Sequence, residues 1–325
     1  MKVLSILIPT YNMEKYLANC VDSMLAIEKK EQLEIIIVND GSKDDSLEIA
    51  KSYKEKYPSI VKVVDKENGG YGSTINKGIK EATGKYFKVV DSDDWVNSKN
   101  VDAFLSELAI ENADMVISDF TCVYENEGRN EIMNGIEASP RIEYSFDKFP
   151  IKQRLSMHKL FFKTELLKSI NLLEKCFYVD VEYVSYGVSK CSSFKYIPLD
   201  IYQYRLGRAG QSVSIDGYYK HKEDLLKVAN SLLQKYSEEK NDNSKEYIHL
   251  ELAALLKTIY SLMIKFYLKD KKTKGMMQEL DESLKKVDLL LYEESNNAVR
   301  FHIMSLIRKT NYKLLAPVSV LKQIF

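Results

Sequence analysis

Three aspartates lie within four residues directly after an apolar run, in the segment DSDD at 91–94. Carboxylates this close repel one another unless a cation lies between them. Asp91 and Asp93 are two residues apart, so at the end of a strand both can turn toward one ion. Such oxygen ligands suit hard divalent cations that bind phosphates. The segment therefore predicts a Mg²⁺ or Mn²⁺ site whose other ligand is a diphosphate, with a solvated turn as the alternative.

Polar clusters also follow three earlier apolar runs, namely PTYN, NDGSKDDS and DKENGGYGS. In open α/β sheets, ligands bind at the carboxyl ends of the strands. Turns are rich in the same residues, but four clusters at one sheet edge favour a shared site. Asp40 could accept hydrogen bonds from a nucleobase or ribose, or else cap a helix. Tyr11 could stack on a base, or else lie in the core.

Two further segments offer groups for a nucleotide. Glycines 69, 70 and 72 let the backbone pass close to a ligand, and Asn76 could bind a hydroxyl. In RLGRAGQSVS at 205–214, arginine side chains suit phosphate oxygens, and the loop could close over a ligand. Solvated arginines on a surface turn are the alternative. His158 could lie on the acceptor side of the site, or else be structural.

Strand-like and helical patterns alternate through the first 120 residues, which predicts a mostly parallel sheet covered by helices on both sides. Further along, we expect a helix near 152–170 and strand-like structure at 191–206. From about residue 217 the patterns are those of long helices. These changes predict a catalytic domain at 1–215 and a helical domain at 216–325.

Bulk composition excludes some function classes. Lys plus Arg equals Asp plus Glu at 47 each, so no global field attracts nucleic acid. The four cysteines show no CxxC pair and the N-terminus does not resemble a signal peptide, so a cytoplasmic protein is expected. The most apolar helical stretch, 252–268, carries two lysines and is expected to be a helix with one buried face rather than a membrane span.

Together the segments SILIPTYN, EIIIVNDGSKDDS, ENGGYGSTINKGIKEATGKYFKVVDSDDW and YQYRLGRAGQSVS resemble inverting family 2 glycosyltransferases of the GT-A fold, over about residues 1–215. The resemblance implies a nucleoside-diphosphate sugar as donor. It also implies that Asp93 binds the metal and that Asp91 meets the ribose or the metal. The expected donor-binding residues are Pro9, Thr10, Tyr11, Asp40, Gly70, Asn76, Asp91, Ser92, Arg208 and Ser212.

The family's catalytic base lies in a stretch similar to FYEDVEF, which corresponds here to CFYVDVEY at 176–183. Asp180 matches the base and Val179 replaces the usual Glu, with Glu182 as the fallback. Asn39 stands where many members have Asp, so nucleobase contacts could differ. Ile75 stands where an Arg often precedes the Asn, so a phosphate contact could be missing.

The last 31 residues, after Glu294, are basic and contain no acidic residue. They predict either peripheral contact with an anionic membrane or a packed helix with a solvated basic face. The expected function is metal-dependent inverting transfer from a nucleoside-diphosphate sugar, with a UDP-sugar as first candidate, to a hydroxyl of a cell-surface glycan or lipid-linked acceptor. The expected location is cytoplasmic, with a peripheral position at the inner face of the cell membrane as an option.

Two other functions share some of these sequence features. A nucleotidyltransferase would need a glycine-rich basic loop after the first strand, where this chain has PTYNMEKY. A catalytically degenerate subunit that binds nucleotide sugars in a glycan-assembly complex is the non-enzymatic alternative. Asp91, Asp93 and Asp180 argue against it, and Val179 slightly favours it.

Overall fold

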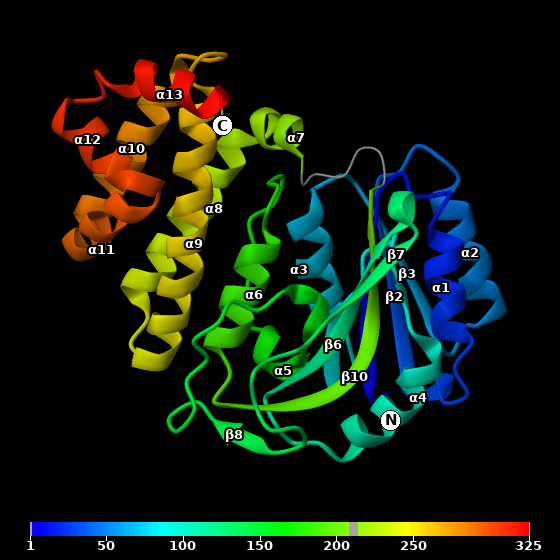
Figure 1. Cartoon of the computed structure of the whole chain (residues 1–325). Helices are drawn as coiled ribbons and strands as arrows, with labels where there is room; N and C mark the ends of the chain where they lie inside the picture. Colours follow the sequence, from blue (N-terminus) through cyan, green and yellow to red (C-terminus); the bar gives the residue numbers. More distant parts are fainter. Residues whose placement is uncertain (1, 208–213, 325) are drawn as a thin grey trace. The chain divides into compact units, whose positions relative to one another are not determined.

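The computed structural model describes residues 2–207 and 214–324, and the chain forms two compact units, Met1–Gly210 and Gln211–Phe325. The first unit has a central mixed sheet with helices on both faces (Figure 1). The second unit is built from helices. The predicted α/β fold with a helical C-terminal region is confirmed.

The sheet contains ten strands, in the order β3-β2-β1-β4-β9-β6-β10-β5, with β7 on β6 and β8 on β10. Their bounds are β1 Leu4–Thr10, β2 Leu33–Asp40, β3 Val61–Lys66, β4 Tyr86–Val89, β5 Trp95–Val96, β6 Met115–Tyr124, β7 Arg129–Met133, β8 Glu143–Ser145, β9 Leu160–Lys163 and β10 Ser193–Leu206. Strands β3, β2, β1 and β4 are parallel, as are β6 and β10. The carboxyl ends of these first four strands therefore lie at one edge, where the sequence predicts the site.

Strand β9 is a correction to the sequence-based expectation of a helix near 152–170. It pairs antiparallel with both β4 and β6, so it lies inside the sheet. Its residues Leu160, Phe161 and Phe162 are fully buried. A short unbroken apolar run has no periodicity that distinguishes a buried strand from a helix. In this region α-helix is confined to α5, Thr164–Leu167.

The helices of the first unit pack on the two faces of the sheet because strand side chains alternate between faces. Ile6 and Ile8 of β1 lie in the core that includes α1 and α4, whereas Leu7 points at α3, where it contacts Gly78. The bounds are α1 Leu17–Leu25, α2 Ser46–Lys56, α3 Tyr71–Glu81, α4 Ser98–Ile110, α5 Thr164–Leu167 and α6 Asp180–Ser189. Together the helices leave the carboxyl ends of the strands to the loops.

The second unit contains the helices α7 Ile215–Lys220, α8 Lys222–Glu238, α9 Asp242–Phe266, α10 Lys272–Val287, α11 Leu289–Glu294, α12 Ile303–Lys309 and α13 Leu315–Ile324. Helix α9 packs against α8 and α10. By length and composition α9 could cross a membrane, but 56% of its most apolar window is buried. Such burial is typical of the central helix of a packed bundle.

The basic C-terminal segment packs within this unit. Nη2 of Arg308 lies 2.6 Å from Oδ1 of Asp281, and both side chains are almost fully buried. Met304, Ile307 and Leu315 are buried as well. Apolar side chains that are buried in the unit cannot insert into lipid. The packing therefore supports the packed-helix alternative and gives no support to the expected membrane contact.

Candidate active site

The acidic segment 91–94 follows β4 at the edge where the parallel strands end. Ser92, Asp93 and Asp94 are buried, and Asp91 is half-buried. The hydroxyl of Tyr71 donates a hydrogen bond to Oδ1 of Asp91 at 2.7 Å. The segment thus lies at the carboxyl ends of the parallel strands, where the sequence predicts it. Its burial argues against the alternative of a solvated turn.

Asp94 is the most buried of the three aspartates. Its Oδ2 accepts a hydrogen bond from the hydroxyl of Tyr202 at 2.5 Å, and its Oδ1 accepts one from the amide of Arg205 at 2.8 Å. Burial raises the pKa of the Asp94 carboxyl well above its usual value, and repulsion by Asp91 and Asp93 raises it further. A bound cation would oppose this repulsion, because it favours the charged form of each carboxyl.

His158 joins this cluster from a different part of the chain. One ligand atom each from Asp91, Asp94 and His158 lie within 4.8 Å of one another. Burial lowers the pKa of His158 to about 3, and the nearby charges of Lys88 and Lys159 contribute, so the imidazole is neutral at physiological pH. Two carboxylates and a neutral imidazole form a donor set that fits a divalent cation such as Mn²⁺.

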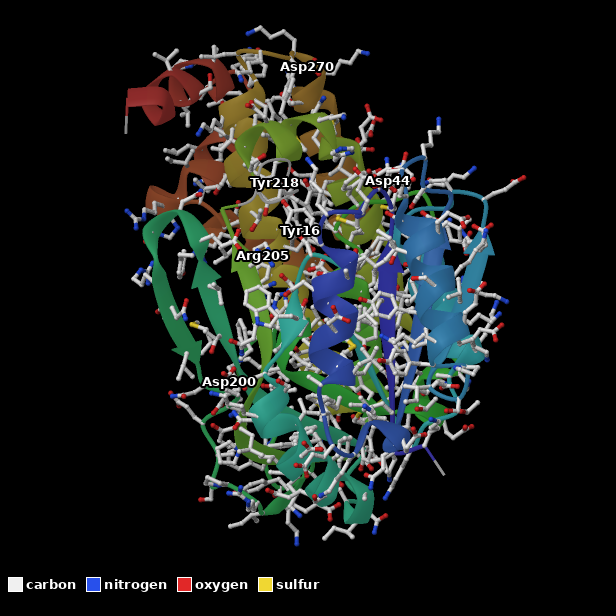
Figure 2. All side chains as sticks on the ribbon, turned by 90° about the vertical axis from the view of Figure 1, so that its right-hand side faces the viewer. Tyr16, Asp44, Asp200, Arg205, Tyr218 and Asp270 are labelled. Carbon is white, nitrogen blue, oxygen red and sulfur yellow. The ribbon has the colours of Figure 1, made fainter. Side chains whose placement is uncertain are left out.

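The predicted metal ligand Asp93 lies outside this three-residue group. Its backbone carbonyl accepts a hydrogen bond from Nε of Arg205 at 2.6 Å. The guanidinium of Arg205 also stacks near the rings of Trp95 and Tyr16, with Tyr16 beside it in Figure 2. Arg205, a residue of β10, therefore holds the acidic segment in place through these hydrogen bonds. The predicted donor-binding residues Arg208 and Ser212 lie outside the described residues, as does Gln211.

Lys88 is a site residue that the sequence analysis missed. It is fully buried in β4 and donates a hydrogen bond to the carbonyl of His158 at 2.6 Å. Its amine also lies 4.3 Å from the ring centre of Phe161. Burial lowers the pKa of Lys88 well below its usual value, although Asp91 opposes the shift. The available signal was a lysine inside the otherwise apolar run YFKVV.

Asp40 holds the glycine loop. Its Oδ1 accepts hydrogen bonds from the Gly69 amide at 2.9 Å and from Lys66, while its Oδ2 accepts one from the Gly70 amide at 2.8 Å. Gly70 has a φ of +81°, a conformation that glycine adopts without strain. Both oxygens of Asp40 thus already bind the protein. Contact between Asp40 and a nucleobase stays a prediction.

Contact between Asn76 and a ligand hydroxyl stays a prediction, and the Asn76 amide already bonds the protein. The side chain is buried, donates to the carbonyl of Leu172 at 2.9 Å and accepts from the Leu172 amide at 2.8 Å. Gly72, one turn earlier on α3, lies against the carbonyl of Leu173 so closely that a Cβ would be 2.0 Å from it. These residues therefore hold α3 against the loop before α6.

That loop leads into the proposed base. Asp180 is the first residue of α6 and is half-buried. Burial and the charges of Asp91 and Asp180 raise the pKa of Tyr71, so Tyr71 lies within electrostatic reach of both carboxylates. The fallback base Glu182 is fully buried and accepts a hydrogen bond from the Leu173 amide at 3.0 Å. This position makes Glu182 a structural residue.

The last residues of β1 and the residue that follows it differ in accessibility. Pro9 and Thr10 are buried, and the Thr10 hydroxyl donates to the carbonyl of Ile8. Tyr11 is 45% exposed, so its ring is accessible for stacking. Asn39 donates from its amide to Oδ1 of Asp65 at 2.7 Å. The Asp that the family resemblance implies at position 39 would instead repel Asp65.

Comparison with known proteins identifies the family. The model of the family described as "Glycosyl transferase family 2" matches residues 5–170, about half of the chain. This chain belongs to glycosyl transferase family 2. It is 31% identical over 210 residues to the "Putative glycosyltransferase EpsH" of Bacillus subtilis, which covers 62% of this chain and 60% of EpsH. It is 30% identical over 213 residues to the "Minor teichoic acid biosynthesis protein GgaB" of the same organism, covering 64% of this chain and 23% of GgaB.

Solved structures show the same fold over nearly the whole chain. Residues 1–349 of S. aureus TarS, solved in complex with UDP-GlcNAc, match with a TM-score of 0.65 and 22% identity, covering 98% of this chain and 88% of that one. This likeness confirms the GT-A architecture. The curated relatives EpsH and GgaB are longer, and this chain spans 60% and 23% of their lengths.

Proposed function

We propose that this protein transfers a sugar from a nucleoside-diphosphate sugar, with a UDP-sugar as first candidate, to a hydroxyl of a cell-surface glycan or a lipid-linked acceptor. The transfer inverts the anomeric configuration and depends on Mn²⁺ or Mg²⁺. The observation that carries the proposal is the position of Tyr71, which hydrogen-bonds Asp91 and is within electrostatic reach of Asp180. This position supports a single site that holds both the proposed cation-binding carboxylate and the candidate base.

The reaction is a single displacement at the anomeric carbon. The acceptor oxygen forms a bond to this carbon while the bond to the diphosphate oxygen breaks, and the bonding pair leaves with the diphosphate. Asp180 accepts the proton of the acceptor hydroxyl. A bound cation supplies positive charge that offsets the charge of the leaving diphosphate. Tyr71 holds Asp91 in place, and Asp40 holds the glycine loop beside it.

Several observations support the choice of donor and acceptor class. TarS was solved with UDP-GlcNAc, and the name of GgaB places that protein in minor teichoic acid biosynthesis. A mannosyltransferase from Pyrobaculum calidifontis with a TM-score of 0.50 was solved with GDP-Man and Mn²⁺. The four cysteines are buried thiols, which suits a cytoplasmic protein. We assign the chemistry to residues 1–215 and treat residues 216–325 as a separate helical domain.

A panel of nucleotide sugars tests the proposal. The full chain is incubated with each donor and Mn²⁺, Mg²⁺ or a chelator, and released nucleoside diphosphate is measured. We expect slow release from one UDP-sugar, its loss with the chelator, and its loss in Asp180→Asn. If nucleotides protect the chain from thermal unfolding but no donor is turned over, the protein is instead a nucleotide-sugar-binding subunit.

A further inference from the structure

We propose that the end of α10 and the helix α11 form a surface that binds a second copy of this chain about a two-fold axis. This surface, the leucine face, consists of the exposed residues Lys286, Val287, Leu289, Leu290 and Glu293. It lies within the helical unit, where α11 packs beside α10 (Figure 1). The inference is independent of the proposed function, because it concerns no residue of the candidate active site.

The first argument is the exposed apolar surface. Leu289 is 59% exposed and Leu290 is 63% exposed, and Val287 nearby in the chain is exposed as well. The next residue, Leu291, is buried and anchors α11 to the unit. Single exposed apolar residues are common on monomeric proteins, whereas contiguous ones mark interaction surfaces. The run of exposed apolar residues therefore indicates that a partner covers this face.

The second argument is a hollow beside the same helix. Its volume is about 180 Å³, and it is lined by apolar side chains that include Leu256 of α9 and Leu291 of α11, and by polar residues such as Asn297. An apolar cavity of about 150 Å³ can hold a benzene molecule, so this hollow has room for one leucine side chain. Helix α11 thus carries projecting leucines close to a hollow of suitable size. A surface that binds its own copy must present both parts of such a contact, because the same patch is used on each copy.

The third argument is the order of charges along the leucine face. Two lysines at 285–286 precede the leucines, and two glutamates at 293–294 follow them. A two-fold axis between Leu289 and Leu290 directs the lysines of each copy toward the glutamates of the other, so that position 286 of one copy meets position 293 of the second.

The charges at these two positions are available for such a contact. Lys286 and Glu293 are exposed, and neither makes an ion pair within residues 2–207 and 214–324. Glu294 already lies 2.8 Å from Nε2 of His249. The pair formed by Lys286 and Glu293 is therefore the one that carries the charge complementarity.

The same charges argue against a lipid surface as the partner. Helices that lie on anionic membranes are rich in lysine and arginine on the polar face. Here Glu293 and Glu294 follow the leucines directly, with Tyr292 between, and an anionic surface would repel them. A protein surface that carries both signs of charge in the reverse order fits better, and a second copy of this chain has that surface.

Sedimentation velocity of the full chain over a range of concentrations measures self-association. We expect a reversible dimer with a dissociation constant of roughly micromolar order, because the face is small. Leu290→Glu should weaken association by about ten-fold or more. Ile110→Glu is the matched control, because Ile110 is 82% exposed at the end of α4 in the other unit and should leave association unchanged. An equal loss in the two variants would contradict the proposal.

Charge reversal tests the two-fold axis. Lys286→Glu and Glu293→Lys should each weaken self-association by roughly ten-fold, because symmetry brings each change into two contacts. The double variant should associate again, since it restores opposite charges at both contacts. An equimolar mixture of the two single variants should form mixed dimers more strongly than either variant alone forms dimers. Circular dichroism and melting temperature verify that each variant is folded.

The proposal would be overturned by a wild type that stays monomeric at about 0.1 mM. Dimers that persist unchanged in Leu290→Glu and in both charge variants would place the interface elsewhere and refute the leucine face. Monomeric protein that binds anionic vesicles through Leu290 would assign the face to a membrane instead. None of these measurements involves turnover of a sugar donor, so their outcome leaves the proposed function unaffected.

Discussion

The hydroxyl of Tyr71 donates a hydrogen bond to Oδ1 of Asp91 at 2.7 Å, and the charge of Asp180 also acts on this hydroxyl. Tyr71 is the first residue of α3, Asp91 follows β4, and Asp180 begins α6. One side chain thus relates the acidic segment at 91–94 to the proposed base. A change in the glycine loop that precedes Tyr71 should therefore affect both the acidic segment and the proposed base.

Removal of this hydroxyl should reduce activity more than stability. A hydrogen bond to a charged group contributes roughly 1.5–3 kcal/mol, so Tyr71→Phe should lower transfer by about ten- to a hundred-fold and weaken metal-dependent nucleotide binding. Steady-state kinetics and calorimetry with UDP and Mn²⁺ measure the two effects. Tyr53→Phe is the control, because its hydroxyl bonds Asp22 on α1 instead. Equal effects of the two variants would contradict a role for Tyr71 in the site.

Asp180 and Glu182 should behave differently although both are acidic residues of α6. Asp180→Asn keeps the shape but cannot accept a proton, so transfer should fall by roughly 10²-fold or more while UDP and Mn²⁺ still bind. Glu182→Gln should chiefly lower the melting temperature, because the fully buried carboxylate accepts a hydrogen bond from the Leu173 amide. Transfer rates and calorimetry check both. Near-normal transfer in Asp180→Asn with none in Glu182→Gln would refute the assignment of the base.

Gly72 should be intolerant of a side chain. A Cβ at this position would lie 2.0 Å from the backbone oxygen of Leu173, so Gly72→Ala must push α3 away from the loop before α6. We expect a loss of about 1–3 kcal/mol or more in the free energy of unfolding. Gly275→Ala, on helix α10 with open space around the new methyl, should instead stabilise by up to about 1 kcal/mol. Thermal unfolding of the two variants compares them, and equal shifts would show that the close approach is relaxed in solution.

Arg308 should be a structural residue of the helical unit. Its guanidinium bonds the buried carboxylate of Asp281 and the hydroxyl of Tyr260. Arg308→Met would leave that carboxylate buried without its cation, which typically costs about 3–5 kcal/mol. The exposed neighbour Lys309→Met should change the melting temperature little. Undiminished stability of Arg308→Met together with lost binding to anionic vesicles would instead revive the membrane contact.

Much of the first unit could be predicted from sequence because its signals are local. The short β-branched apolar runs of β1 and β2, and the polar clusters that follow them, are patterns of residues a few positions apart. The segment at 91–94 and the stretch around Asp180 could be recognised from their residue types, and so could the family. Strand β9 could not, because its apolar run is only three residues long, LFF at 160–162, and no turn residues bound it to distinguish a buried strand from a helix.

Only the tertiary structure decided which side chains are available to a ligand. Asn76 and Asp40 have the chemistry of donor-binding residues, yet their hydrogen bonds go to Leu172 and to the glycine loop. His158 has no sequence feature that links it to Asp91, and the two meet because β9 enters the sheet beside β4. Residue type determines what a side chain can bind, but long-range packing decides which groups it meets, because partners distant in sequence compete for the same atoms.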